Sequence, residues 1–122
     1  MEEEMKIASE HSPKDCTTTL MNLNDALYAI GGKWKLRVVM ALMGNTTRFN
    51  ELQRIISGIS ARVLSNELKE LELNGFVNRK VFTGTPVIIE YELTAYSQTL
   101  HPVLKSLSDW GSMHRAHIRK SK

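Results

Sequence analysis

The chain has 122 residues, of which 42% are hydrophobic, 24% charged and 7% aromatic. This length and composition predict one globular domain and leave no room for two independent cores. The longest apolar run, residues 38–43, is far shorter than the roughly 18 residues of a membrane-spanning helix, which excludes such a helix. The acidic start, Met1-Glu2-Glu3-Glu4, lacks the basic and apolar segments of a secretory signal peptide, so we expect the protein in the cytoplasm.

Charge is distributed unevenly along the chain. The formal net charge is +3, but residues 1–15 are acidic, and residues 16–122 hold 14 basic against 8 acidic side chains. The first segment is polar and has no apolar period, so we interpret residues 1–15 as a flexible arm and residues 16–122 as the folded domain. A basic domain favours a polyanionic partner without identifying it.

The first half of the domain shows the apolar spacing of helices. The pattern predicts a first helix over residues 19–30, which ends at Gly31-Gly32, and a second over residues 33–43. A short extended segment at residues 46–49 precedes a third helix at about residues 50–56.

A fourth helix and a hairpin follow. Ser60 is a typical helix cap, and the helix it predicts, residues 60–73, carries Leu64, Leu68 and Leu71 on one face. The apolar period then changes from 3.6 to 2, which predicts two strands, residues 76–82 and 87–93, joined by a turn. A short helix capped by Thr94 and broken at Pro102, and a last helix over residues 102–119, complete the chain.

This order predicts a mainly α fold with a β-hairpin wing, the winged helix-turn-helix, in which the second helix of the motif enters the DNA major groove. On the face of residues 60–73 opposite the leucines, four side chains that can hydrogen-bond fall on one stripe at i, i+3, i+4 and i+7: Arg62, Ser65, Asn66 and Lys69. Arginine can bind guanine and asparagine adenine, so the stripe favours base recognition. An ordinary solvated helix face is the alternative.

Further basic residues extend this surface. We expect Arg79 and Lys80 on the hairpin to contact the DNA backbone or the minor groove, Arg48 to contact phosphates, and Ser60 to help anchor the recognition helix on DNA. The basic residues at the start of the second helix, Lys33, Lys35 and Arg37, are candidates for additional phosphate contacts. The two hairpin phenylalanines, Phe76 and Phe82, share a side of the strand pattern and are expected to pack in the core.

Several motifs together resemble the HxlR-type transcription regulators of the MarR-like winged-helix group. They are Ile30-Gly31-Gly32-Lys33-Trp34, Arg48-Phe49-Asn50-Glu51-Leu52, Gly58-Ile59-Ser60, Leu68-Lys69-Glu70-Leu71-Glu72, Gly75-Phe76-Val77, Glu90-Tyr91-Glu92-Leu93-Thr94, Pro102-Val103-Leu104 and Trp110-Gly111. The resemblance covers about residues 16–112. It implies a homodimeric bacterial DNA-binding regulator with its recognition helix at residues 60–73 and its wing at residues 76–93.

The terminal helices carry more apolar residues than one small core requires. We therefore predict a homodimer interface between the helices at residues 19–30 and 102–119, as the resemblance also implies; the alternative is that these residues close the monomer core. The residues assigned to this interface are Leu20, Leu23, Leu27, Leu104, Leu107 and Trp110.

Cys16 is the only cysteine and therefore cannot form a disulfide within the chain. It lies close to a helix amino terminus, where the helix dipole favours the reactive thiolate, and some HxlR-type regulators have a sensing cysteine at a matching place. Cys16 is thus a candidate redox or electrophile sensor, with an incidental thiol as the alternative.

No enzyme signature is present, whether a nucleophile with its base, a phosphate-binding glycine loop or a zinc motif, so we expect neither an enzyme nor a cofactor. His114 and His117 are explained by the helix dipole, and no metal site is expected. The expected partners are double-stranded DNA, a second copy and a small-molecule or electrophile effector, without a membrane. The alternative function is a winged-helix protein-interaction module that lacks specific DNA binding.

Overall fold

The computed structural model describes residues 13–121, so most of the acidic arm expected at residues 1–15 lies outside the described residues. The chain divides into two compact units, Met1–Gly32 and Lys33–Lys122, and each is described by itself. Within residues 13–121, no helix combines the length and the hydropathy that crossing a membrane would require.

The first unit contains helix α2, Pro13–Ile30. The helix begins six residues before the predicted start at residue 19, and residues 13–15, which we assigned to the arm, are helical. Proline is favoured in the first turn of a helix because its missing N–H has no partner there anyway. At the other end, the N–H of Gly31 donates to the carbonyl of Leu27 at 2.7 Å.

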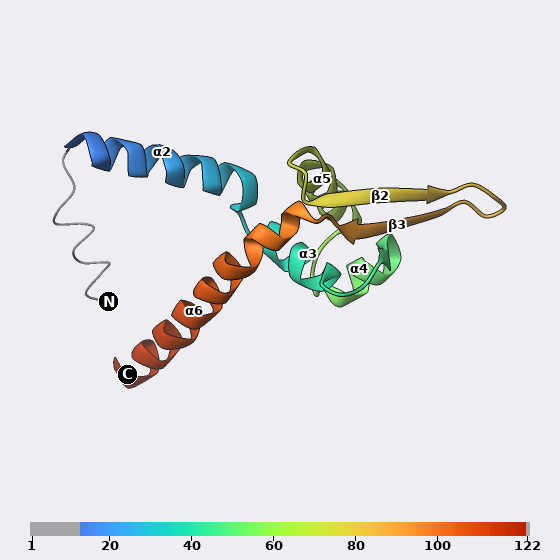
Figure 1. Cartoon of the computed structure of the whole chain (residues 1–122). Coiled ribbons are helices and arrows are strands. Elements are labelled where there is room, and N and C mark those ends of the chain that lie inside the picture. The colour runs from blue at the N-terminus through green and yellow to red at the C-terminus, as the bar shows by residue number, and fades with distance from the viewer. Residues whose placement is uncertain (1–12, 122) are drawn as a thin grey trace. The chain divides into compact units, whose positions relative to one another are not determined.

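The second unit combines helices with a small sheet (Figure 1). Its strands form an antiparallel sheet in the order β1-β3-β2. In chain order the elements are α3 (Lys35–Leu42), β1 (Thr47–Arg48), α4 (Phe49–Ile55), α5 (Ala61–Leu73), β2 (Val77–Phe82), β3 (Ile88–Leu93), the 3₁₀ helix η1 (Tyr96–Leu100) and α6 (His101–Ser121). This arrangement confirms the predicted mainly α fold with a hairpin wing.

The core of the second unit lies where α3, α4 and α5 meet the base of the hairpin. The predicted leucine stripe of α5 is fully buried there, and Val38, Val39, Leu52 and Val77 pack into the same core. Burial of one such side chain is worth about 1.5 to 3 kcal/mol, so the leucine stripe fixes which face of α5 points outward.

The end of α5 is tied to the hairpin. Gly75 adopts φ +85°, which a glycine tolerates, and the N–H of Phe76 donates to the carbonyl of Leu71 at 2.9 Å, as in a Schellman motif. The Thr94 hydroxyl, at the end of β3, donates to the carbonyl of Gly75 at 2.6 Å. The angle between α5 and the hairpin is therefore set by hydrogen bonds at the base of the hairpin, where β2 begins and β3 ends.

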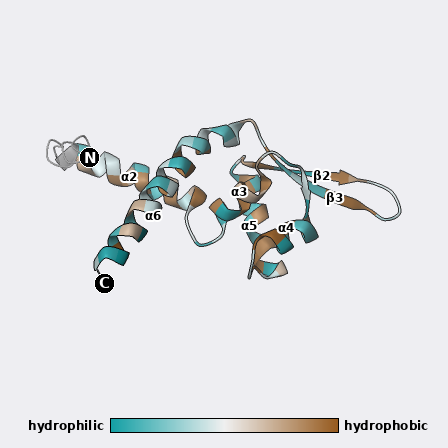
Figure 2. Cartoon of the chain, turned by 90° about the horizontal axis from the view of Figure 1, so that it is seen from below, coloured by the Kyte–Doolittle hydropathy of each residue, from teal (hydrophilic) through white to brown (hydrophobic). Residues whose placement is uncertain are grey.

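The hairpin and the last helix each contain one residue that we predicted wrongly. Phe76 is buried and stacks on Tyr96 with ring centroids 5.4 Å apart, but Phe82 is 49% exposed because the outer part of the hairpin extends past the helices (Figure 2). Pro102 does not break a helix. It lies in the first turn of α6, where η1 passes directly into α6 at His101.

Candidate nucleic-acid interface

A tight turn places α5 after α4. Gly58 has φ +86°, and the N–H of Ile59 donates to the carbonyl of Ile56 at 3.3 Å, which closes the turn. The side-chain oxygen of Ser60 then accepts a hydrogen bond from the N–H of Val63 at 3.1 Å. This bond confirms Ser60 as the helix cap, because it satisfies one of the free N–H groups of the first turn.

The predicted stripe lies on the outer face of α5. Arg62, Asn66 and Lys69 are exposed and Ser65 is half-buried, while the leucines on the opposite face are buried. All four stripe residues can hydrogen-bond to the edges of bases or to phosphates. The fold thus presents them together on one helix face.

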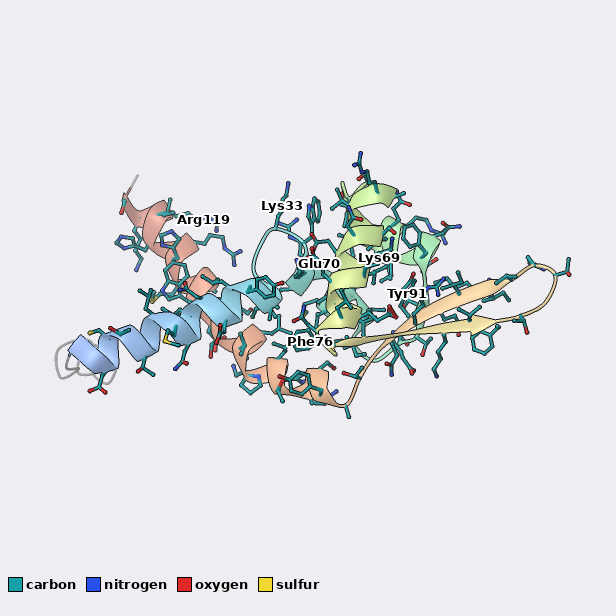
Figure 3. All side chains as sticks on the ribbon, turned by 90° about the horizontal axis from the view of Figure 1, so that it is seen from above. Lys33, Lys69, Glu70, Phe76, Tyr91 and Arg119 are labelled. Atoms are coloured by element: carbon teal, nitrogen blue, oxygen red, sulfur yellow. The ribbon has the colours of Figure 1, made fainter. Side chains whose placement is uncertain are left out.

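The hairpin adds two residues to this face. A cavity of about 370 Å³ between α5 and the hairpin is lined by Ser65, Leu68, Lys69 and Glu72 of α5 and by Arg79 and Tyr91 of the hairpin. Figure 3 shows Lys69 on the side of α5 next to Tyr91, with Glu70 on the other side of the helix. Sequence reasoning missed Tyr91, although its pairing opposite Arg79 follows from the hairpin register.

Lys80 lies apart from Arg79. Successive residues of a strand point to opposite faces, so Lys80 is on the face of the sheet that carries Glu90 and Glu92. Lys80 Nζ lies 3.1 Å from Glu92 Oε2, and on the same face Arg48 Nε lies 4.0 Å from Glu90 Oε2. The structure therefore gathers Arg79 with the α5 stripe but places Arg48 and Lys80 elsewhere, each beside a carboxylate.

Lys35 does not point into solvent, so the prediction that it contacts phosphate is wrong. Its ammonium bridges two carboxylates of α5, Glu67 at 2.9 Å and Glu70. Burial acts to lower the pKa of Lys35, but hydrogen bonds and charge attraction from Glu70 and Glu67 outweigh it, and the pKa lies above its ordinary 10.5. Lys35 is thus a link between α3 and α5.

The two neighbouring basic residues remain exposed. The Lys33 ammonium lies 4.7 Å from the centroid of the Trp34 ring, and the Arg37 guanidinium carbon lies 5.3 Å from it. Cation–π contacts of this kind hold a side chain in place while leaving its charge accessible.

Cys16, the candidate sensor, and most of the residues predicted for the dimer interface are exposed. Cys16 lies in the first turns of α2. On α2, Leu20, Leu23 and Leu27 are more than half exposed; on α6, Leu107 and Trp110 are 50% and 57% exposed, whereas Leu104 is half-buried. Trp110 stacks on His114 with ring centroids 4.7 Å apart. Among residues 13–121, no three His, Cys, Asp or Glu side chains gather as metal ligands would.

The chain is similar to known regulators. A family model of HxlR-like helix-turn-helix proteins matches residues 29–119. An uncharacterized HTH-type transcriptional regulator of Methanothermobacter thermautotrophicus is 38% identical over 102 residues, which span 84% of this chain and 78% of the relative. The redox regulator HypR in its reduced form superposes with a TM-score of 0.75 at 35% identity, over 81% of this chain and 98% of HypR. The reduced form of the transcriptional regulator YodB from B. subtilis gives a TM-score of 0.65 at 32% identity, over 82% of this chain and 90% of YodB. The chain therefore belongs to the HxlR-like helix-turn-helix family, and its relatives are named transcriptional regulators.

Proposed function

We propose that the protein is a sequence-specific DNA-binding transcription regulator that acts as a homodimer and places α5 in the major groove. The observation that carries this proposal is the exposed stripe on α5, held outward by the buried leucines and continued by Arg79 on the hairpin. Membership of a helix-turn-helix family supports DNA as the partner. Such a role agrees with the cytoplasm expected from the sequence.

The stripe residues have distinct roles in this proposal. Arg62 addresses a guanine and Asn66 an adenine, each in bidentate fashion, while Ser65 and Lys69 bind base edges or phosphates. The Ser60 side-chain oxygen caps the first turn of α5, and its hydroxyl can at the same time donate a hydrogen bond to a phosphate.

Phosphate contacts come from cations that have no carboxylate partner. Among the described residues, Arg62, Lys69 and Arg79 are in no ion pair, whereas Arg48 and Lys80 lie beside Glu90 and Glu92. Breaking an existing pair offsets part of the gain from a phosphate, so we expect Arg79 to contribute more than Arg48 or Lys80.

The proposed dimerisation rests on the apolar side chains that α2 and α6 expose. A second copy related by a two-fold axis would cover these faces and present two recognition helices to half-sites about 34 Å apart. The residues we assign to this interface are Leu20, Leu23, Leu27, Leu104, Leu107 and Trp110.

We assign a redox or electrophile response to Cys16. The thiol is exposed, and the similar structures include the redox regulator HypR in its reduced and oxidized forms and diamide-treated YodB from B. subtilis. A disulfide between the Cys16 thiols of two chains, or a Cys16 adduct, would change the dimer that binds DNA.

The test of DNA binding begins with the full-length protein and a pool of random duplexes, from which bound sequences are selected and their dissociation constants measured at two salt concentrations. Arg62→Ala should weaken binding to the selected duplex by about 1 to 3 kcal/mol and relax the choice at one base position. Lys105→Ala, which removes an equally positive side chain from α6, is the matched control and should change neither. Failure to select any sequence over random DNA would favour the protein-interaction module instead.

Oxidation is tested on the same duplex. Diamide should abolish binding by the wild-type protein and leave binding by Cys16→Ser unchanged. Equal sensitivity of the two proteins, or no sensitivity in either, would remove Cys16 from the proposal and keep the DNA-binding role.

A further inference from the structure

The outer part of the hairpin is an exposed apolar blade. Residues 81–89 contain no charged side chain. Within this segment Val81 is 47%, Phe82 49% and Val87 57% exposed, and Figure 2 shows the end of β2 and the start of β3 coloured as hydrophobic. The described chain provides no cover for these side chains, so their exposure requires an explanation.

Both faces of the blade are apolar. Val81 pairs with Ile89 on the face that carries Arg79 and Tyr91 nearer the helices. Phe82 pairs with Ile88 on the face that carries Lys80. A projecting hairpin that is apolar on both sides can be buried on both sides only if it enters a groove.

The charge at the base of the hairpin and its position beside α5 favour a groove of DNA as the binding site. At the base of the blade, Arg79 is in no ion pair among the described residues, whereas on the opposite face Lys80 lies beside Glu92 and Arg48 beside Glu90. A negatively charged wall therefore suits the base on the Arg79 face, and an apolar interior suits the tip. The face with Arg79 and Tyr91 is also continuous with the cavity beside α5 that belongs to the proposed DNA surface.

The minor groove provides these features, with phosphates at its edges and sugars along its walls. Its width in B-form DNA is about 6 Å, which is narrower than a β-hairpin carrying side chains on both faces. The groove must therefore open to admit the blade, and proteins that open it insert apolar side chains between base steps.

We propose that Val81, Phe82 and Val87 form an apolar wedge that enters the minor groove beside the site read by α5, opens it and partly unstacks one base step. This inference rests on the proposed DNA-binding function. The wedge makes recognition depend on how easily the flanking step deforms, with pyrimidine–purine steps favoured over A-tracts, although no side chain hydrogen-bonds to that step.

The experiment uses a duplex selected from the random pool by the full-length protein, with 2-aminopurine placed in turn at each flanking position. Wild-type protein should raise the fluorescence at one flank, because 2-aminopurine brightens when it unstacks. It should also bind the duplex about tenfold more weakly when a flexible step at that flank is replaced by an A-tract. Phe82→Ala should lose both effects, as should Val87→Ser.

The control variant is Leu73→Ser, which removes an 86% exposed apolar side chain at the end of α5 and should retain both effects. Because the wedge side chains are about half exposed, the variants should melt at nearly the wild-type temperature, which excludes loss of folding as the cause. If Phe82→Ala binds the selected duplex like the wild type and no flank brightens, the wedge is refuted while DNA binding stands, and the tip is left for a protein partner. If no duplex is selected at all, the proposed function itself fails.

Discussion

The ion-paired link between α3 and α5 should contribute measurably to the stability of the fold. Lys35 has a side chain only 11% exposed, and its ammonium neutralises Glu67 and Glu70 on the recognition helix. The Glu67 side chain is 19% exposed and that of Glu70 is 56% exposed. Replacing Lys35 with methionine keeps the length and apolar stem of the side chain but leaves one largely buried carboxylate without its cation.

The size of the effect follows from this burial. Exposed ion pairs contribute up to about 1 kcal/mol, whereas removal of one partner of a fully buried pair costs about 3 to 5 kcal/mol. One partner here is nearly buried and the other is half exposed, so we expect Lys35→Met to lower the free energy of unfolding by about 2 kcal/mol. For a domain of this size that corresponds to a fall in Tm of about 8 °C.

Thermal and urea unfolding of the two proteins measure this difference. The control is Lys33→Met, which removes an exposed ammonium near Trp34 and should cost less than about 1 kcal/mol. Adding Glu67→Gln to Lys35→Met should restore part of the lost stability, because the stranded charge is then gone. Equal melting of Lys35→Met and wild type, or no rescue by Glu67→Gln, would refute this account of the link.

The same link gives a pH dependence. Because the pKa of Lys35 is raised in the folded protein, the folded state holds this proton more tightly than the unfolded state. The contribution is therefore complete below the ordinary value of 10.5 and is lost as the pH rises through the folded pKa. The difference in free energy of unfolding between wild type and Lys35→Met should be constant from pH 7 to pH 9, which lies below the ordinary lysine pKa of 10.5. It should shrink as the pH rises above 10.5. A difference that persists unchanged at high pH would contradict the assigned charge pairing.

Three further predictions concern other contacts. Ser60→Ala removes the cap of α5 and should lower the free energy of unfolding by about 1 kcal/mol in a thermal melt, while an unchanged Tm would remove the cap from the account. Gly75→Ala should lower the free energy of unfolding by about 1 to 2 kcal/mol, because a residue with a Cβ is strained at a φ of +85°. The added carbon itself meets no clash, because its nearest neighbour, in the Tyr96 ring, lies at an ordinary 3.8 Å. Leu107→Glu should convert a dimer to a monomer in sedimentation and weaken binding to the selected duplex; a dimer that survives would move the interface elsewhere.

The fold was predictable where its signals are local. The buried leucines of α5, its cap at Ser60 and its end at Gly75 are all read within one stretch of chain, and the structure places the helix at Ala61–Leu73. The hairpin has the same advantage, because alternation and a turn are adjacent in sequence. The early start of α2 was missed because residues 13–18 carry no apolar period, although Pro13 was an available signal for a first turn.

Phe82 shows a limit of periodicity. A period of 2 tells which residues share a face of the hairpin, but burial also depends on how far the helices extend along it. Phe76 lies over the helical body and Phe82 lies past its edge, so the same pattern gives one buried and one exposed phenylalanine. The sequence could not show this difference, because it follows from the size of the layer beneath.

The roles of the basic residues were the hardest to predict, because a count of charges does not show which of them are already paired. Lys35 looked like a phosphate contact because it lies between Lys33 and Arg37, yet its partners are about thirty residues away on another helix. Arg79 and Lys80 are neighbours in sequence, yet only Lys80 meets a carboxylate. Among the described residues, the cations without such a partner include Arg62 and Lys69 on the exposed face of α5 and Arg79 on the hairpin, and Lys69 and Arg79 line one cavity. A phosphate can bind these three without first displacing a carboxylate. Attraction to DNA should therefore depend on where unpaired charge accumulates, and the modest net charge of +3 should contribute little to it.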